Sequence, residues 1–147
     1  MLARGALIAA LYIVLVWAFA PISFGAIQLR IAEGLTLLPI LFPEAVPALF
    51  VGVLLSNIIG GLGPWDVVGG SLVTLLAAYV TRRFRHSWIA YASPILFNAL
   101  LISIYLHYIY NLPYWLTAVS IGVSQSIAVL GLGIPLLRVL KSRLGDK

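Results

Sequence analysis

Long runs of apolar residues alternate along the chain with short polar, proline-containing or glycine-containing segments. We expect six helices, over residues 3–20, 30–42, 45–59, 65–82, 87–108 and 113–140. A helix needs about 20 mostly apolar residues to cross a bilayer, and most of these runs approach that length. Strong breaks separate them, such as Gly60-Gly61-Leu62-Gly63-Pro64. The pattern therefore predicts an all-α membrane protein with six transmembrane helices.

The second run is the least regular of the six. Residues 30–42 are short for a bilayer span, and Pro39 is expected to kink the helix. Five spans with a re-entrant segment over residues 21–42 are the alternative. An odd number of spans would place the Arg82–Arg85 cluster and the basic tail on opposite sides of the membrane, so the charge pattern favours six.

Composition supports the membrane interpretation. The chain is 63% hydrophobic and 9% charged, and its mean hydropathy is +1.11. A soluble domain of 147 residues cannot bury that much apolar surface, so a lipid bilayer is the expected solvent. Six spans leave about 27 residues for connections, which predicts a single transmembrane domain over residues 1–147. We expect the first run to be a retained helix, because no small-residue cleavage site follows it.

The basic residues predict the orientation of the chain. If both termini are cytoplasmic, eight of the 9 Lys and Arg residues lie on the cytoplasmic side, as the positive-inside rule requires. These residues are Arg4, Arg82, Arg83, Arg85, Arg138, Lys141, Arg143 and Lys147. Topology and anionic headgroups thus account for the net charge of +5, and no nucleic acid partner is expected. Only Arg30 falls on the far side.

Polar side chains are rare inside the predicted spans, and most lie toward the non-cytoplasmic half. Such groups usually face a cavity or a partner, because exposure to lipid is costly. We therefore expect several of them to line one pocket with aromatic walls. The expected site residues are Arg30, Glu33, Asn57, Trp65, Asp66, Asn98, Trp115 and Gln125. Amides and a carboxylate beside aromatic rings suit a flat heterocycle rich in hydrogen-bonding groups.

Structural roles are the alternative for the same residues. Arg30 and Glu33 are one helical turn apart and could form an ion pair, Asp66 could cap the fourth helix, and Asn98 and Gln125 could join neighbouring helices.

Small residues repeat at a spacing of four on three spans. The stripes Ala48/Gly52/Ser56 and Ala118/Gly122/Ser126 are expected to pack inside the bundle. The stripe that contains Ala6 and Ala10 begins at the predicted cytoplasmic end. It could either pack inside the bundle or dock a partner protein.

Motifs of catalysis are missing from the sequence. The chain has no cysteine, no Gly-x-x-x-x-Gly-Lys phosphate loop, no His-Glu-x-x-His and no Gly-x-Ser-x-Gly. We expect neither an enzyme nor a bound metal or cofactor.

The run from Ala20 to Pro39, APISFGAIQLRIAEGLTLLP, followed by Phe42-Pro43-Glu44-Ala45, is similar to the QueT family. The segments Asp66–Leu72 and Pro94–Ala99 share this similarity, which covers nearly the whole chain. QueT proteins are substrate-binding (S) components of energy-coupling factor (ECF) transporters and are assigned to uptake of queuosine precursors, which are 7-deazaguanine bases. The resemblance implies a six-helix bundle of the ECF S-component type in a prokaryotic plasma membrane.

The resemblance also implies partners and a closing device. Ala6 and Ala10 resemble the small-residue motif by which S components dock on the membrane-embedded T subunit, and two ATPase subunits then power the toppling that carries substrate inward. The loop between the first two spans, Pro21–Leu29, is implied to cap a site near the extracellular side.

One position departs from the family pattern. The family commonly has a Glu in the sixth span where this sequence has Gln125. Gln offers one acceptor and one donor, so either Glu33 or Asp66 supplies the carboxylate here or the substrate preference differs. The choice among the 7-cyano base, the 7-aminomethyl base and queuine stays open. An S component for another vitamin, a stand-alone facilitator and a membrane enzyme are the alternative functions.

Overall fold

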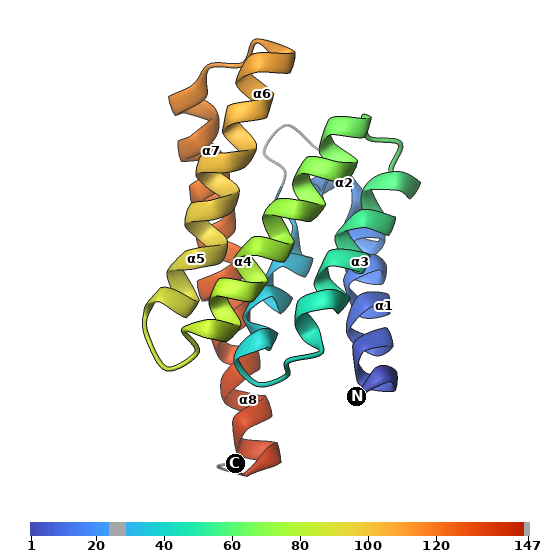
Figure 1. Ribbon diagram of the computed structural model, residues 1–147, viewed down its shortest axis with the longest axis vertical. Helices are drawn as coiled ribbons and strands as arrows, with labels where there is room; N and C mark the ends of the chain where they lie inside the picture. The colour runs from blue at the N-terminus through green and yellow to red at the C-terminus, as the bar shows by residue number, and fades with distance from the viewer. Residues whose placement is uncertain (24–28, 146–147) are drawn as a thin grey trace.

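The computed structural model describes residues 1–23 and 29–145, and every regular element in these ranges is a helix. The expected all-helical fold is therefore confirmed for this part of the chain. The elements are α1 (Leu2–Ala18), α2 (Ala20–Ser23), η1 (Ile31–Ile40), α3 (Ala45–Ile59), η2 (Asp66–Gly70), α4 (Ser71–Arg83), α5 (Ile89–Phe97), η3 (Asn98–Ile102), α6 (Ser103–Tyr110), α7 (Tyr114–Ala128), η4 (Val129–Gly133) and α8 (Ile134–Leu144). Figure 1 shows a bundle of roughly aligned rods with both termini at the same end.

The longest rods arise because α-helices continue through π-helical turns. α5, η3 and α6 form one rod over Ile89–Tyr110, and α7, η4 and α8 form another over Tyr114–Leu144. These rods have 22 and 31 residues and are long and apolar enough to cross a membrane. Their lengths are roughly 33 and 46 Å, against a hydrocarbon core of about 30 Å. That all six helical segments cross the bilayer stays a prediction.

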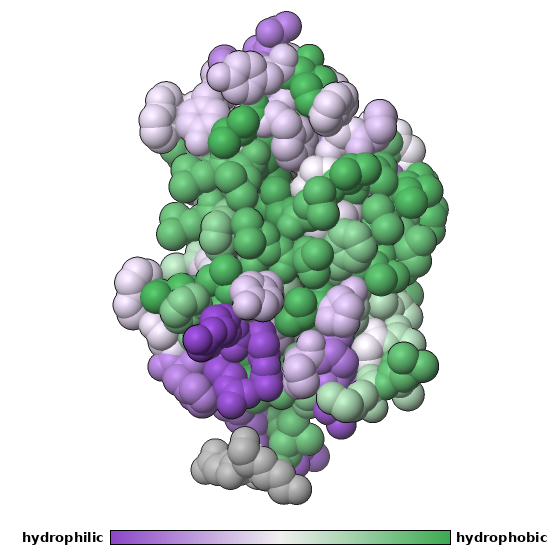
Figure 2. All heavy atoms as spheres, viewed as in Figure 1, coloured by the Kyte–Doolittle hydropathy of each residue, from purple (hydrophilic) through white to green (hydrophobic). Residues whose placement is uncertain are grey.

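The outer surface is the kind that lipid, rather than water, solvates. On the face shown in Figure 2, hydrophobic residues cover the middle of the molecule and strongly hydrophilic residues gather toward the end with the termini. Large apolar side chains are exposed along the rods, including Leu72, Leu76, Val119 and Val123. Such a continuous apolar belt is untypical of a soluble monomer and fits a membrane protein.

α1 and α3 pack side by side through small residues. Ala48, Gly52 and Ser56 of α3 are buried. A methyl group added at Gly52 would lie 3.1 Å from the Tyr12 Cβ and 3.4 Å from the Ala9 carbonyl oxygen. The expectation that this stripe packs inside the bundle is thus confirmed, because a larger residue at Gly52 would force the helices apart.

η1 departs most from the sequence expectation. It is a 3-10 helix of 10 residues, and every residue from Ala32 to Ile40 is buried. At about 2.0 Å per residue it extends only about 20 Å. The segment expected to be helical over residues 30–42 is thus helical over Ile31–Ile40, and it is wound as a buried 3-10 helix. That it crosses the bilayer stays a prediction.

Glycines and a basic side chain hold η1 in the centre. A methyl group added at Gly133 of η4 would lie 2.9 Å from the Gly34 carbonyl oxygen, so only a glycine permits this approach. At the other end of η1, the Arg82 guanidinium donates to the carbonyl oxygens of Pro39 and Ile40 at 3.2 and 3.3 Å. Arg82 therefore supplies donors to carbonyls that the end of a helix leaves without backbone partners.

Candidate functional site

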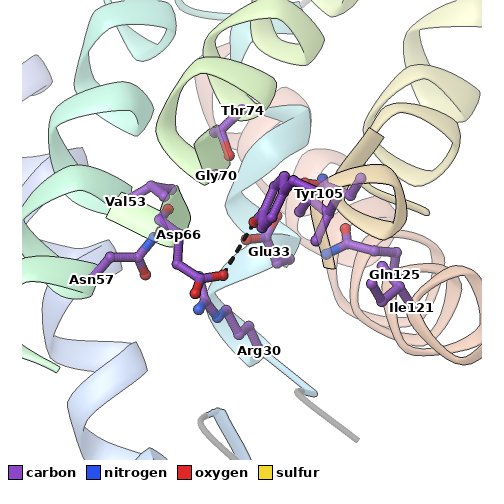
Figure 3. A pocket seen from close by; sticks show the side chains of 12 residues that line it. Arg30, Glu33, Val53, Asn57, Asp66, Gly70, Thr74, Tyr105, Ile121 and Gln125 are labelled. Atoms are coloured by element: carbon purple, nitrogen blue, oxygen red, sulfur yellow. Dashed lines mark hydrogen bonds between the residues drawn. The ribbon is translucent and has the colours of Figure 1, made fainter. Parts of the chain in front are cut away.

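A small cavity lies between η1, α3, η2, α4, η3, α6 and α7, toward the end of the bundle away from the termini. Figure 3 shows the side chains that line it. Its volume is about 40 Å³, which is room for roughly three water molecules. It is lined by Arg30, Glu33, Val53, Asn57, Asp66, Gly70, Thr74, Asn98, Ile102, Tyr105, Ile121 and Gln125. The structure therefore brings six of the expected site residues together from separate helices.

Glu33 lies at the inner wall of the cavity. Its side chain projects from η1 and is 3% exposed. The Tyr12 hydroxyl of α1 donates a hydrogen bond to Glu33 Oε1 at 2.5 Å. Among the described residues, no donor reaches the buried Oε2. One carboxylate oxygen is thus held by Tyr12, and the other is buried without a donor.

Two amides present further acceptors. Asn57, near the end of α3, donates from Nδ2 to the Asp66 carbonyl oxygen at 3.0 Å, and this bond orients its Oδ1 away from that carbonyl. In the described part of the chain, neither Asn57 Oδ1 nor Gln125 Oε1 receives a hydrogen bond, although both atoms are buried. An unsatisfied buried polar group costs about 1–3 kcal/mol, so three of them at one cavity indicate a place for donors from outside the protein fold.

Asp66 lines the cavity on the side away from the termini. It opens η2, and its carboxylate accepts hydrogen bonds from two tyrosines of α6. The Tyr105 hydroxyl donates to Oδ1 at 3.3 Å, the contact drawn as a dashed line in Figure 3, and the Tyr110 hydroxyl donates to Oδ2 at 3.2 Å. These bonds tie the start of the η2–α4 rod to α6, so Asp66 joins two helices besides lining the cavity.

Arg30 lies at the rim, as the residue that precedes η1. Its side chain extends below Asp66 in the close-up (Figure 3). The lining thus contains one guanidinium and two carboxylates, those of Glu33 and Asp66. This charge set can bind both donor and acceptor groups of a polar ring.

The π-helical turns explain how polar residues reach the cavity. Asn98 begins η3 and lines the cavity, and its Nδ2 donates to the Pro94 carbonyl oxygen at 2.8 Å. Pro94 has no N–H, so the Ala90 carbonyl oxygen lacks its usual helical donor. The Thr81 hydroxyl donates to the Ala90 carbonyl oxygen instead, at 3.2 Å. π-turns often occur at functional sites because the added residue rotates the following side chains.

Two of the expected site residues do not line the cavity. Trp65 and Trp115 are 60% and 73% exposed and lie on the outer surface. The residues of α7 that line the cavity are Ile121 and Gln125. The aromatic ring at the cavity is Tyr105. Tyr105 and Tyr12 are functional candidates that the sequence reasoning missed, although a tyrosine in an apolar span is a signal because its buried hydroxyl needs a partner.

Other expected features fall outside this cavity. Ala6 and Ala10 are exposed on α1, and Ala6 lines an apolar groove of about 330 Å³ between α1 and α3. The predicted capping loop, Pro21–Leu29, contains residues 24–28, which lie outside the described residues. Within residues 1–23 and 29–145, no three His, Cys, Asp or Glu side chains gather in a way that would hold a metal ion.

Comparison with known families identifies the chain. A model described as "QueT transporter" matches residues 2–142. The chain belongs to the QueT transporter family. This confirms the family resemblance found in the sequence and makes a transport protein, rather than an enzyme, the coarse functional class. No match was found among curated proteins or among solved structures.

Proposed function

We propose that this QueT family member is the substrate-binding S component of an ECF-type importer and that it captures a 7-deazaguanine base from outside the cell. The observation that carries the proposal is the set of three buried acceptor oxygens without donors, Glu33 Oε2, Asn57 Oδ1 and Gln125 Oε1, around one cavity. A 7-deazaguanine carries N–H donors at N1, at the exocyclic amine and at the pyrrole nitrogen. These three nitrogens carry four N–H donors, enough for each of the three acceptor oxygens to receive a hydrogen bond.

Each polar group then has a role in binding. Glu33 accepts from the donor edge of the base through Oε2, while Tyr12 holds Oε1. Asn57 and Gln125 accept from the remaining N–H groups, and Arg30 donates to the ring carbonyl. Tyr105 supplies the aromatic wall in place of the expected tryptophans. A site of this kind discriminates strongly, because an analogue without the donors leaves buried acceptors unpaired.

Binding requires the cavity to enlarge. Its volume of about 40 Å³ is far below the 300–1,000 Å³ that is typical of ligand pockets, on the order of tenfold smaller. The base therefore displaces water and shifts neighbouring helices, and the hydrogen bonds from Tyr105 and Tyr110 to Asp66 are the contacts that close the outer end. Substrate binding then selects a state with a wider cavity.

Orientation and partners follow the same proposal. Both termini lie at one end of the bundle (Figure 1), and the positive-inside rule supports a cytoplasmic location for that end. The family resemblance implies a prokaryotic plasma membrane. Ala6 and Ala10 are exposed on α1, where they are accessible to a T subunit. The resemblance to ECF S components implies two ATPase subunits as the source of energy, and this sequence contains no phosphate loop of its own.

Calorimetry on the purified protein tests the proposal. The ligands are 7-cyano-7-deazaguanine, 7-aminomethyl-7-deazaguanine, queuine, guanine and common vitamins. We expect at least one 7-deazaguanine to bind and the vitamins not to bind. Binding of a vitamin alone would indicate an S component of another specificity, and transport by the protein alone in proteoliposomes would indicate a stand-alone facilitator.

Docking is tested separately from binding. Ala6→Trp adds bulk to the exposed face of α1 and is expected to leave ligand binding unchanged while transport by the assembled importer is lost. Matched loss of binding and transport would contradict a separate docking face.

A further inference from the structure

A second groove lies at the end of the molecule that holds the termini. It is lined by Tyr91 of α5 and by Ile134, Leu137, Arg138 and Lys141 of α8, and its volume is about 370 Å³. α8 carries the chain toward the C-terminus at this end (Figure 1). The groove shares no residue with the cavity around Glu33, so it is a separate feature.

The groove is basic along one edge. Arg138 and Lys141 are three residues apart and therefore share one face of α8; both are exposed. The carboxylates of the described residues belong to Glu33, Glu44 and Asp66, and none of them lines the groove. Within residues 1–23 and 29–145, neither Arg138 nor Lys141 forms an ion pair. The positive charge of this edge is thus available to an anion.

The rest of the groove is apolar. Leu137 is 3% exposed and packs with Ala90 and Val129 in a core cluster that Tyr91 and Ile134 border. Trp88, just before α5, is 73% exposed, and an exposed tryptophan at a helix end is typical of the membrane–water interface. Figure 2 shows hydrophobic residues giving way to strongly hydrophilic ones toward this end. The groove therefore offers an anion site and an apolar slot at one interface.

We propose that this groove binds an anionic phospholipid of the leaflet that faces the end with the termini. Arg138 and Lys141 hold the phosphate of the headgroup, and an acyl chain lies against Tyr91, Ile134 and Leu137. A free phosphate would contact only the basic edge of the groove and would not fill its apolar part. Because a lipid uses both parts, the chemistry of the whole groove selects it.

Native mass spectrometry of the detergent-solubilised full chain tests this. Phosphatidylglycerol, phosphatidylcholine and glycerol phosphate are added in separate experiments. We expect phosphatidylglycerol to be retained about tenfold more than phosphatidylcholine, on the basis of two cationic side chains near the phosphate. Equal retention of the two lipids would overturn the proposal, and so would equal binding of glycerol phosphate, which carries the anion without acyl chains.

Matched variants locate the effect. Arg138→Gln/Lys141→Gln is expected to abolish the preference for phosphatidylglycerol. Arg83→Gln/Arg143→Gln removes the same charge at the same end but outside the groove, and it is expected to retain the preference. Equal loss in both double variants would show a general surface-charge effect and contradict a specific site. The comparison of the three ligands on the unaltered chain decides the question if a variant does not fold.

Discussion

At the end of the bundle that holds the termini, charged side chains lie at or near the surface, whereas toward the opposite end they point inward around a cavity. Arg4 pairs with Glu44 at 2.9 Å and lies over the Phe42 ring, and the Arg4 side chain is 52% exposed. Glu33, in contrast, is 3% exposed. Arg30 and Asp66, at the rim of the cavity, are half-buried, so the charges at the second end are less exposed than Arg4.

Incomplete pairing gathers around the cavity, although Glu44 Oε2 at the other end is also buried without a donor among the described residues. Tyr12 satisfies one oxygen of Glu33, and Asn57 uses its Nδ2 on a backbone carbonyl. Each keeps a buried oxygen without a donor in the described residues. A fold selected only for stability would not retain such groups at one cavity, because each costs about 1–3 kcal/mol. The gathering of such groups at one cavity supports the proposal that this part of the chain gives up stability for binding.

The largest expected effect concerns the packing that holds η1, and with it Glu33, in the centre. Gly133→Ala places a methyl group 2.9 Å from the Gly34 carbonyl oxygen, and overpacking of this kind costs about 1–3 kcal/mol. Gly131→Ala is the control in the same π-turn, because its methyl group would meet nothing within 4 Å. Thermal unfolding in detergent should show a clear loss of stability for Gly133→Ala only. Equal melting temperatures for the two variants would contradict the close approach of η1 and η4.

The next effect concerns the carboxylate of the cavity. Glu33→Gln removes a charged acceptor and should weaken binding of a 7-deazaguanine at least tenfold, on the order of 1.4 kcal/mol. Glu44→Gln, at the other end of the bundle, should leave the dissociation constant unchanged. Calorimetry measures both. If Glu33→Gln and Asn98→Ala each bind the base like the unaltered protein, the binding site is elsewhere.

A smaller effect is expected at the hydrogen bonds that α6 donates to Asp66. Tyr105→Phe removes the 3.3 Å hydrogen bond to Asp66 Oδ1 and should lower the free energy of unfolding by about 0.5–1.5 kcal/mol. Tyr108→Phe is the control, because Tyr108 is 79% exposed on the same helix. Denaturation curves that are identical for the two variants would show that the bond to Asp66 does not stabilise α6.

The smallest effect belongs to the surface ion pair. Arg4→Gln breaks the bond to Glu44, and an exposed pair of this kind contributes about 0.2–1 kcal/mol. Screening should reduce the difference between Arg4→Gln and the unaltered protein in about 1 M salt. Arg143→Gln, which breaks no ion pair among the described residues, should have no effect. A loss for Arg4→Gln as large as that for Gly133→Ala would mean that the two ends do not differ as described.

Much of the secondary structure followed from the apolar runs and their breaks. α3 covers Ala45–Ile59, the range expected from the sequence, because Pro43 precedes it and a glycine-rich segment follows. The residues of the cavity were also largely predictable, since a polar side chain in an apolar run is costly unless it faces a cavity or a partner. The 3-10 winding of η1 and its close approach to Gly133 of η4 were not predicted.

Which face of each helix points into the bundle could be learned only from the tertiary structure. Trp65 and Trp115 were expected at the site and lie on the surface, while Tyr105 and Tyr12 line or support it. In a membrane protein the lipid side is as apolar as the protein core, so a uniformly apolar run carries no periodic signal that tells one face from the other. The sequence by itself determined which segments become helices and which residues are too polar for lipid. The tertiary structure decided which way each helix turns, because contacts between helices, and not the polarity of the surroundings, set that rotation.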